Sequence, residues 1–234
     1  MEVIQKSRIA AERMAGAPAQ PIDRLSALLG HFRLRAQLFH AGPLCGRVGY
    51  ESLPGRAFLH VLRRGTLTVH HGPMAGIAGV AGIGPAMELH EPTVLLYARP
   101  LFHEFVHAPG EDSSFTCAML EFDGAERNPI VQALPPLICV PSMRIDGLQA
   151  TLDLLFAETD HVRCGSRVLA DRLFEVVFIQ LLRWILDHPE DVGITGGMIA
   201  GLSDARLARA IVAMHREPAR EWTLGALAAQ AAMS

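Results

Sequence analysis

The sequence predicts an α+β fold, in which an antiparallel β-barrel or sandwich is followed by α-helices. Up to about residue 145, short stretches of alternating apolar and polar residues are separated by glycine and proline, which is typical of half-buried strands. After residue 145 the apolar residues take a helical spacing. The chain has 234 residues, of which 50% are hydrophobic and 19% charged, so it can bury a large core and is not disordered as a whole.

Charge and cysteine content narrow the class of protein. The net charge is −3, from 21 Lys and Arg against 24 Asp and Glu, so a nucleic-acid role has to lie in a local module. The four cysteines form no CxxC pair, which favours reduced thiols in a cytoplasmic protein. The N-terminus lacks the apolar stretch of a signal peptide, and the longest uncharged run is interrupted by proline, histidine and glycine. We therefore expect a soluble cytoplasmic protein without a membrane partner.

Eight segments carry the strand pattern. In residues 32–39, Phe32, Leu34, Ala36 and Leu38 share one face, and arginine or glutamine lies between them. The other segments are residues 45–51, 57–63, 66–71, 87–97 with a break at Pro92, 101–107, 114–122 and 137–140. So many short strands at close spacing are typical of an all-β sandwich or barrel.

Helical spacing predicts one short helix before the strands, over residues 22–29, and two longer helices after them. The first of the longer helices follows Asp146 and runs to about residue 158. The second begins at Ser166 and runs to about residue 188, where a proline stops it. Asp146 and Ser166 are the expected N-caps.

The second long helix is apolar around nearly its whole circumference, so it must be buried on two sides. We favour a homodimer seam along this helix, and full burial inside one chain is the open alternative. The expected dimerisation residues are Phe174, Phe178, Leu181 and Trp184.

Two more helices are expected near the end of the chain. Ser203 or Asp204 can cap a helix that runs to residue 215 and carries an apolar face with i, i+3, i+4, i+7 spacing. The members of this face are Leu207, Ala210, Ile211 and Met214. After a turn, Thr223 can cap a last helix over residues 224–232.

Residues 204–234 also carry a set of motifs at fixed spacing. The motifs are Met214-His215, Pro218, Trp222-Thr223, Leu224, Leu227-Ala228 and Met233-Ser234. Together they resemble the opening of an AraC/XylS-type DNA-binding domain. The resemblance implies the first half of a helix-turn-helix, whose recognition helix would enter the major groove of DNA. The core positions that it implies are Leu207, Ile211, Met214, Trp222, Thr223, Leu224 and Leu227.

The same resemblance implies that the sequence is part of a longer regulator, cut inside its DNA-binding domain. Residues 204–234 hold four arginines against three acidic residues, a net charge of +1, which is too little for binding driven by DNA phosphates. We therefore expect the full-length protein to bind DNA and this chain not to.

Three motifs in the β-rich part resemble the cupin-type sensor domain that precedes the helix-turn-helix pair in many such regulators. They are the hairpin sequence of residues 58–67, the sequence CAMLEFD at residues 117–123, and Leu134-Pro135-Pro136. The resemblance spans residues 22 to about 190 and implies a cupin-like antiparallel β-barrel. The resulting division is an N-terminal extension (1–21), a sensor barrel (22–145), a helical dimerisation and linker region (146–200), and the truncated start of a DNA-binding domain (201–234).

Histidines in the predicted barrel are candidate metal ligands. His60, His103 and His107 could supply imidazoles to Zn²⁺ or Ni²⁺, because His103 and His107 share one face of a predicted strand. The sequence departs from the cupin pattern, however. The second cupin motif, expected at residues 91–103, lacks its Gly, Asp and Pro, and His60 has no second His two residues later. We therefore prefer the alternative that these histidines are polar residues that bind no metal.

A barrel of about eight strands has room for one small ligand. The residues expected to line an effector site inside it are His60, Tyr97, His103, Phe105 and Cys117. Ordinary core packing is the alternative, above all for Phe105 and Cys117.

The sequence thus predicts a transcription regulator rather than an enzyme. A small-molecule effector binds a barrel, and a homodimer presents two C-terminal helix-turn-helix domains to DNA. A metal-dependent cupin oxygenase or isomerase, using His60 and His103, is the alternative from the enzyme class. A dimerisation module with a filled barrel is the third possibility.

Overall fold

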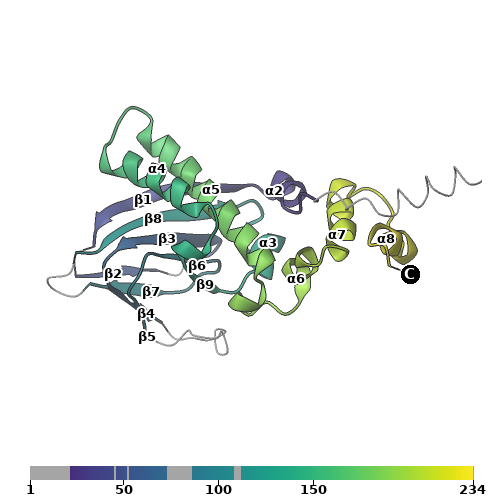
Figure 1. Ribbon diagram of the computed structural model, residues 1–234, viewed down its shortest axis with the longest axis horizontal. Helices are drawn as coiled ribbons and strands as arrows, with labels where there is room; N and C mark the ends of the chain where they lie inside the picture. The colour runs from purple at the N-terminus through teal and green to yellow at the C-terminus, as the bar shows by residue number, and fades with distance from the viewer. Residues whose placement is uncertain (1–21, 45, 52, 73–85, 108–111, 234) are drawn as a thin grey trace, which may run out of the picture.

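The computed structural model describes residues 22–44, 46–51, 53–72, 86–107 and 112–233. In these ranges a short helix is followed by two antiparallel sheets and then by a series of helices, so the predicted α+β class is confirmed (Figure 1). The predicted N-terminal extension lies outside the described residues, as do Cys45 and Ser234.

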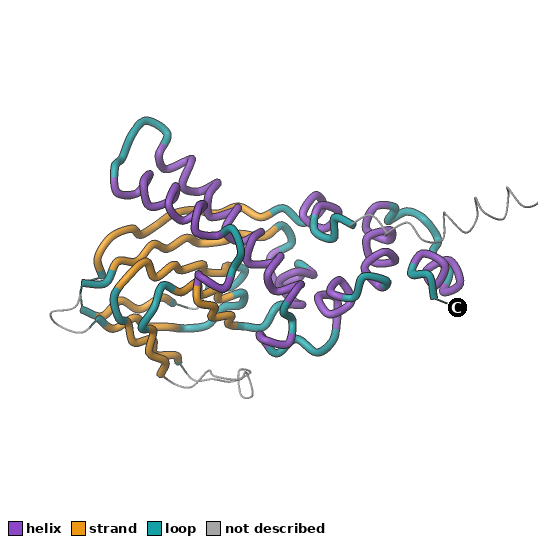
Figure 2. The backbone as a smooth tube through the Cα atoms, in the orientation of Figure 1, coloured by secondary structure: helices purple, strands orange, loops and turns teal. Residues whose placement is uncertain are grey.

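The described residues form nine strands, close to the predicted segments. They are β1 (Leu34–Pro43), β2 (Arg47–Tyr50), β3 (Arg56–Arg64), β4 (Leu67–His71), β5 (Ala86–Leu89), β6 (Thr93–Tyr97), β7 (His103–Val106), β8 (Ser114–Phe122) and β9 (Leu137–Pro141). One sheet has the order β1-β8-β3-β6-β9 and the other the order β2-β7-β4-β5. Both sheets contribute side chains to a common interior core, and in the described ranges no strand pairing joins them into one ring. Their strands are drawn in orange in Figure 2.

The helices of the described ranges lie mostly after the strands. They are α2 (Ser26–His31), α3 (Pro129–Ala133), α4 (Leu148–Asp160), α5 (Ser166–Asp187), α6 (Gly197–Ser203), α7 (Leu207–Arg216) and α8 (Leu224–Gln230), with short 3₁₀ turns η1 (Ala125–Arg127), η2 (Ser142–Arg144) and η3 (Glu190–Val192). Helices α4 and α5 cover the five-stranded sheet, while α6, α7 and α8 extend beyond its end (Figure 1). None of these helices has the length and apolar character needed to cross a bilayer.

The five-stranded sheet is buried on both faces, and strand alternation divides its side chains between two cores. On β3, Leu59 and Val61 pack against the helices, whereas Phe58, His60 and Leu62 face the interior between the sheets. The helix-side core is the larger, because α4 and α5 bring their apolar faces to it. The interior core is rich in aromatic side chains.

One side of helix α5 is buried inside its own chain. Phe174, Phe178 and Leu181 are 0% exposed and Trp184 is 6% exposed. The ring of Phe178 lies 5.4 Å from that of Phe122 on β8. The prediction that these four residues form a dimer seam is therefore wrong, because the outer face of the five-stranded sheet already covers them. The alternative, full burial within one chain, holds for these four residues but not for the whole helix, because Val168, Leu169 and Val176 are exposed.

Polar side chains of α5 complete the free edge of the five-stranded sheet. The carboxylate of Asp171 accepts a hydrogen bond of 2.6 Å from the backbone N–H of Leu38, and Arg167 donates one of 2.9 Å to the Leu38 carbonyl. These side chains take the place of a neighbouring strand, so the edge of β1 is satisfied where it passes under the helix.

The helix starts differ in part from the prediction. Gly147 and Gly165, both with positive φ, precede α4 and α5, so Asp146 and Ser166 are not the N-caps. The Ser166 hydroxyl lies 2.7 Å from a carboxylate oxygen of Glu158 instead, where it donates and joins the two helices. The predicted cap at Thr223 is confirmed, because its hydroxyl accepts a hydrogen bond of 3.1 Å from the Ala226 N–H.

Candidate functional site

Two histidines that the sequence singled out meet in the interior between the sheets. His60 lies in the middle of β3, and His103 begins β7 in the opposite sheet. Their Nε2 atoms are 2.8 Å apart, and both side chains are 0% exposed. We call these two residues the histidine pair.

A backbone carbonyl fixes the proton arrangement of the histidine pair. The Leu101 carbonyl oxygen lies 2.8 Å from His103 Nδ1, so this nitrogen carries a hydrogen and donates it. Neutral His103 then accepts at Nε2, and His60 Nε2 must be the donor. His60 Nδ1 is left as an acceptor that has no hydrogen-bond partner among the described residues.

Burial keeps the histidine pair uncharged. It lowers the pKa of His103 from 6.5 to about 4, although the Leu101 carbonyl acts in the opposite direction. Burial also holds the pKa of His60 well below its ordinary value, and the nearby His103 and His40 lower it further. Near pH 7 the pair is therefore a neutral donor and a neutral acceptor.

The predicted metal site is not assembled. His107 lies one residue beyond the end of β7, and its backbone N–H donates to the Gly46 carbonyl. In the described ranges no three His, Cys, Asp or Glu side chains come together as a metal-binding group. The pair's Nε2 atoms also bind each other, whereas zinc sites use three or four protein ligands. That His60, His103 and His107 bind a metal stays a prediction, and the described residues do not gather the three ligands that it needs.

The five residues predicted to bind an effector do come together in the interior. The Tyr97 ring stacks on His103 at 3.7 Å with an interplanar angle of 7°, and Phe105 lies edge-on to His60 at 4.9 Å. Cys117 is paired directly with His60 across β3 and β8. All five are 0% exposed, so an effector could enter only if packed rings moved. That they bind an effector stays a prediction.

The interior does not favour a reactive cysteine. Burial raises the pKa of the Cys117 thiol well above 9.0, so the thiolate is disfavoured. Its sulfur lies 3.9 Å from the Tyr50 hydroxyl, and burial raises the pKa of that hydroxyl as well. Both groups therefore stay protonated and neutral.

Sequence reasoning missed a cavity of about 280 Å³ at one end of the five-stranded sheet, which we call the sheet-end cavity. The starts or ends of β3, β6 and β8 meet η1 and α3 there. Residues that define it are Arg56, Ala57, Arg99, Phe122, Glu126 and Val131. No motif marks these residues, which are scattered over the sequence and meet only because three strands end together.

The C-terminal segment that resembles a helix-turn-helix is docked on the rest of the chain. Helix α7 packs against α6 so closely that a Cβ added at Gly201 would lie 2.7 Å from Ile211 Cδ1. His215 at the end of α7 meets the Phe32 ring at 5.9 Å. Arg24 donates to Asp187 at the end of α5 and to the Leu202 carbonyl of α6. The segment is thus tied to the sheet layer through α2 and α6.

The predicted core positions of this segment are only partly buried. Ile211, Met214, Trp222 and Leu227 are half-buried, whereas Leu207 is 41% and Leu224 85% exposed. Helix α7 instead buries its smaller residues, Ala208, Ala210 and Val212. The Trp222 indole N–H donates to the Glu217 carbonyl at 3.2 Å, and the guanidinium of Arg220 lies over its ring. That the seven residues form the core of a DNA-binding domain stays a prediction.

The sequence of this chain is similar to those of several known proteins. The family model described as Cupin matches residues 23–187. An AraC-like transcription regulator of Streptomyces antibioticus is 34% identical over 107 residues, which cover 45% of this chain and 35% of that protein. A second AraC-like regulator, of Streptomyces lividans, is 29% identical over 127 residues, 53% of this chain and 41% of that protein. The matched parts thus span well under half the length of these relatives.

Among solved structures, apo ToxT of Vibrio cholerae is similar with a TM-score of 0.38 and 8% sequence identity. The similarity covers 87% of this chain and 71% of that one.

Proposed function

Because this chain belongs to the cupin family, with the match covering its two sheets and helices α4 and α5, we propose that it is the ligand-sensing part of an AraC-type transcription regulator. One observation carries the proposal. The sheet layer continues through α5 and α6 into α7, a turn and an α8 that Thr223 caps, which is the order that the opening of a helix-turn-helix requires. The names of the two Streptomyces relatives support it.

The enzyme alternative has weaker support. A metal-dependent cupin enzyme needs a cluster of ligands with an open coordination position, and the histidine pair lacks a third ligand in the described ranges. The relatives are named as transcription regulators. We therefore infer a regulator that works in the cytoplasm rather than a metal-dependent enzyme.

The mechanism requires that an effector bind one arrangement of the chain better than another. Contacts of α2 and α6 with α7 supply the mechanical connection, because a ligand that moves either helix also moves the start of the DNA-binding segment. The residues predicted to bind the effector inside the barrel remain one proposed location, provided that the interior can open.

We propose that the regulator is a homodimer that associates through the outer faces of α4 and α5. Large apolar side chains are exposed there. They are Leu154 (60% exposed), Val168 (64%), Leu169 (47%) and Val176 (41%). This surface replaces the wrongly predicted seam on the buried side of the same helix.

The proposed function is tested with the complete gene product and a random DNA library. Repeated rounds of selection should enrich one sequence motif, and its binding should weaken steeply as salt rises, since phosphate contacts release counterions. Recovery of no motif at low salt would contradict a DNA-binding regulator. The chain of 234 residues alone is the matched control, and we expect it to enrich none.

A further inference from the structure

We propose that the sheet-end cavity is a binding site for a small carboxylic acid with an apolar body, and that this acid is the effector. The second part rests on the proposed regulatory function, whereas the first part, binding, does not.

The floor of the sheet-end cavity is apolar and built from the ends of three strands. Ala57 is 1% exposed, Ala98 2%, and Phe122 and Val131 are each 7% exposed, so this surface is firmly packed from behind. At about 280 Å³ the cavity is slightly smaller than the usual range for small-molecule sites. It therefore suits a ligand smaller than a typical drug, whose hydrocarbon part covers this floor.

The rim carries two guanidinium groups with unused donors. Arg99 Nη2 donates to the carbonyls of Leu134 at 2.8 Å and Gln132 at 3.3 Å, which fixes the group in place. Its Nε and Nη1 donate no hydrogen bond to the described residues. Arg56 has Glu121 as its nearest carboxylate at 3.9 Å, which is too far for a hydrogen bond.

These charges favour an anionic ligand. Arg56 and Arg99 line the cavity with one acidic residue, Glu126. The carboxylate of Glu121, 3.9 Å from Arg56, lies outside the lining, so among the lining residues the arginines outnumber the acid by one. A carboxylate accepts charge-assisted hydrogen bonds from guanidinium donors, which are the stronger kind of hydrogen bond. A neutral alcohol would gain less, and an amine would be repelled by both arginines.

The position of the cavity explains how an occupant could act at a distance. Val131 and Gln132 belong to α3, which packs against α6, and α6 in turn packs against α7. Arg99 is also shared with a neighbouring surface hollow that is lined by residues 192–196, directly before α6. A ligand that engages Arg99 and α3 therefore touches a helix that packs against α6, and α6 holds the start of the DNA-binding segment.

The test uses three unbranched six-carbon probes that differ at one end: hexanoate, 1-hexanol and hexylamine. Each is titrated into the chain, and binding is measured by calorimetry and by the shift in melting temperature, since a ligand that binds only the folded state stabilises it. We expect hexanoate to bind at least tenfold more tightly than the other two. Preferential binding of hexylamine, or binding of no probe, would overturn the proposal.

A matched pair of variants locates the site. Arg56→Gln should weaken hexanoate binding about tenfold, as expected for loss of one charged hydrogen bond. Arg127→Gln, which removes an exposed arginine of η1 outside the cavity, should leave it unchanged. Loss of binding in His60→Phe together with normal binding in Arg56→Gln would move the site to the barrel interior and overturn the assignment.

Measuring DNA binding of the complete gene product separates the two parts of the proposal, which are binding of the acid and its role as effector. A change in affinity for the selected DNA on addition of hexanoate, absent in Arg56→Gln, supports the acid as effector. Binding that depends on Arg56 but leaves DNA affinity unchanged keeps the sheet-end cavity as a ligand site and overturns only its role as the effector site.

Discussion

His60 Nε2 donates a hydrogen bond to His103 Nε2 over 2.8 Å and thereby connects the two sheets through their shared interior. The direction of this bond follows from the Leu101 carbonyl, which takes the other His103 proton. An uncharged hydrogen bond between two buried rings costs no ion desolvation, so it is compatible with the aromatic residues around it.

The two histidines should be energetically coupled. His60→Phe and His103→Phe should each lower the free energy of unfolding by about 1–3 kcal/mol, because each leaves a buried nitrogen unpaired. The double variant should cost clearly less than the sum of the two, as measured by urea denaturation near pH 7.5. Additive costs would show that the two rings do not bind each other.

Acid should destabilise the fold between pH 7 and pH 4. The pKa of His103 is about 4 in the folded chain and near its ordinary 6.5 in the unfolded chain, so the unfolded chain binds more protons in this window. The stability from a neutral His103 is complete above about pH 7 and falls by roughly 2 kcal/mol by pH 5. Denaturation at several pH values measures the slope. His103→Phe should make it less steep, since the lowered pKa of His60 still contributes, and an equally steep slope in this variant would contradict the assignment.

The outer face of α4 and α5 should mediate dimer formation. Leu169→Glu and Val176→Glu place buried charges in the proposed interface and should shift the chain from dimer to monomer in sedimentation experiments. Val162→Glu, at an 85% exposed position in the turn before α5, is the control and should leave the dimer intact. A monomer in the unmodified chain at high concentration would rule out this interface.

The Thr223 cap should stabilise α8 locally. Thr223→Ala removes the acceptor for the Ala226 N–H and should cost about 1 kcal/mol. Amide hydrogen exchange over Leu224–Gln230 should become faster, while exchange in α5 stays the same. Thr223→Ser keeps the hydroxyl and should retain most of the protection. Equal exchange in all three proteins would show that the cap has no role.

Strand alternation made most of the fold predictable. The predicted face of residues 32–39 is confirmed for Ala36 and Leu38, which pack on the helix side. The pattern could not reveal the β-bulge, in which Leu38 pairs with Ala118 but His40 with Cys117. Phe39 is therefore the extra residue of the bulge. After it the alternation shifts by one residue, so His40 lies on the same face of the sheet as its partner Cys117.

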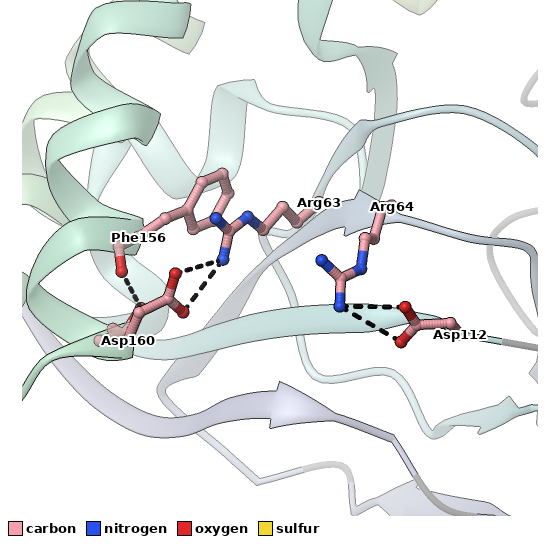
Figure 3. Close-up of polar contacts among 6 residues, drawn as sticks. Arg63, Arg64, Asp112, Phe156 and Asp160 are labelled. Carbon is pink, nitrogen blue, oxygen red and sulfur yellow. Dashed lines mark hydrogen bonds and ion pairs between the residues drawn. The ribbon is translucent and has the colours of Figure 1, made fainter.

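A second β-bulge, in β3, was also not predictable from the pattern. Leu62 pairs with Phe115 and Arg64 with Ser114, which leaves Arg63 as the extra residue. Figure 3 shows the result: Arg63 reaches α4, where it binds Asp160 and lies over Phe156, while Arg64 binds Asp112. The sequence contains two adjacent arginines, and its pattern did not predict that their side chains would bind partners in different elements.

The candidate site was predictable only in part, for a physical reason. Side-chain alternation placed His60 and Phe105 in the interior, because period-two patterns report which face a residue occupies. The sheet-end cavity depends on where strands stop relative to one another, and the burial of α5 depends on what lies opposite it. Neither the cavity nor the burial of α5 can be predicted from the sequence of one segment alone.

The bulge at Phe39 makes the length of β1 as important as its composition. Removing one residue there would turn His40 away from Cys117 and send an imidazole towards the aliphatic layer beneath α5. Sequence changes in this edge strand are thus expected to be substitutions, and insertions or deletions are expected to be absent.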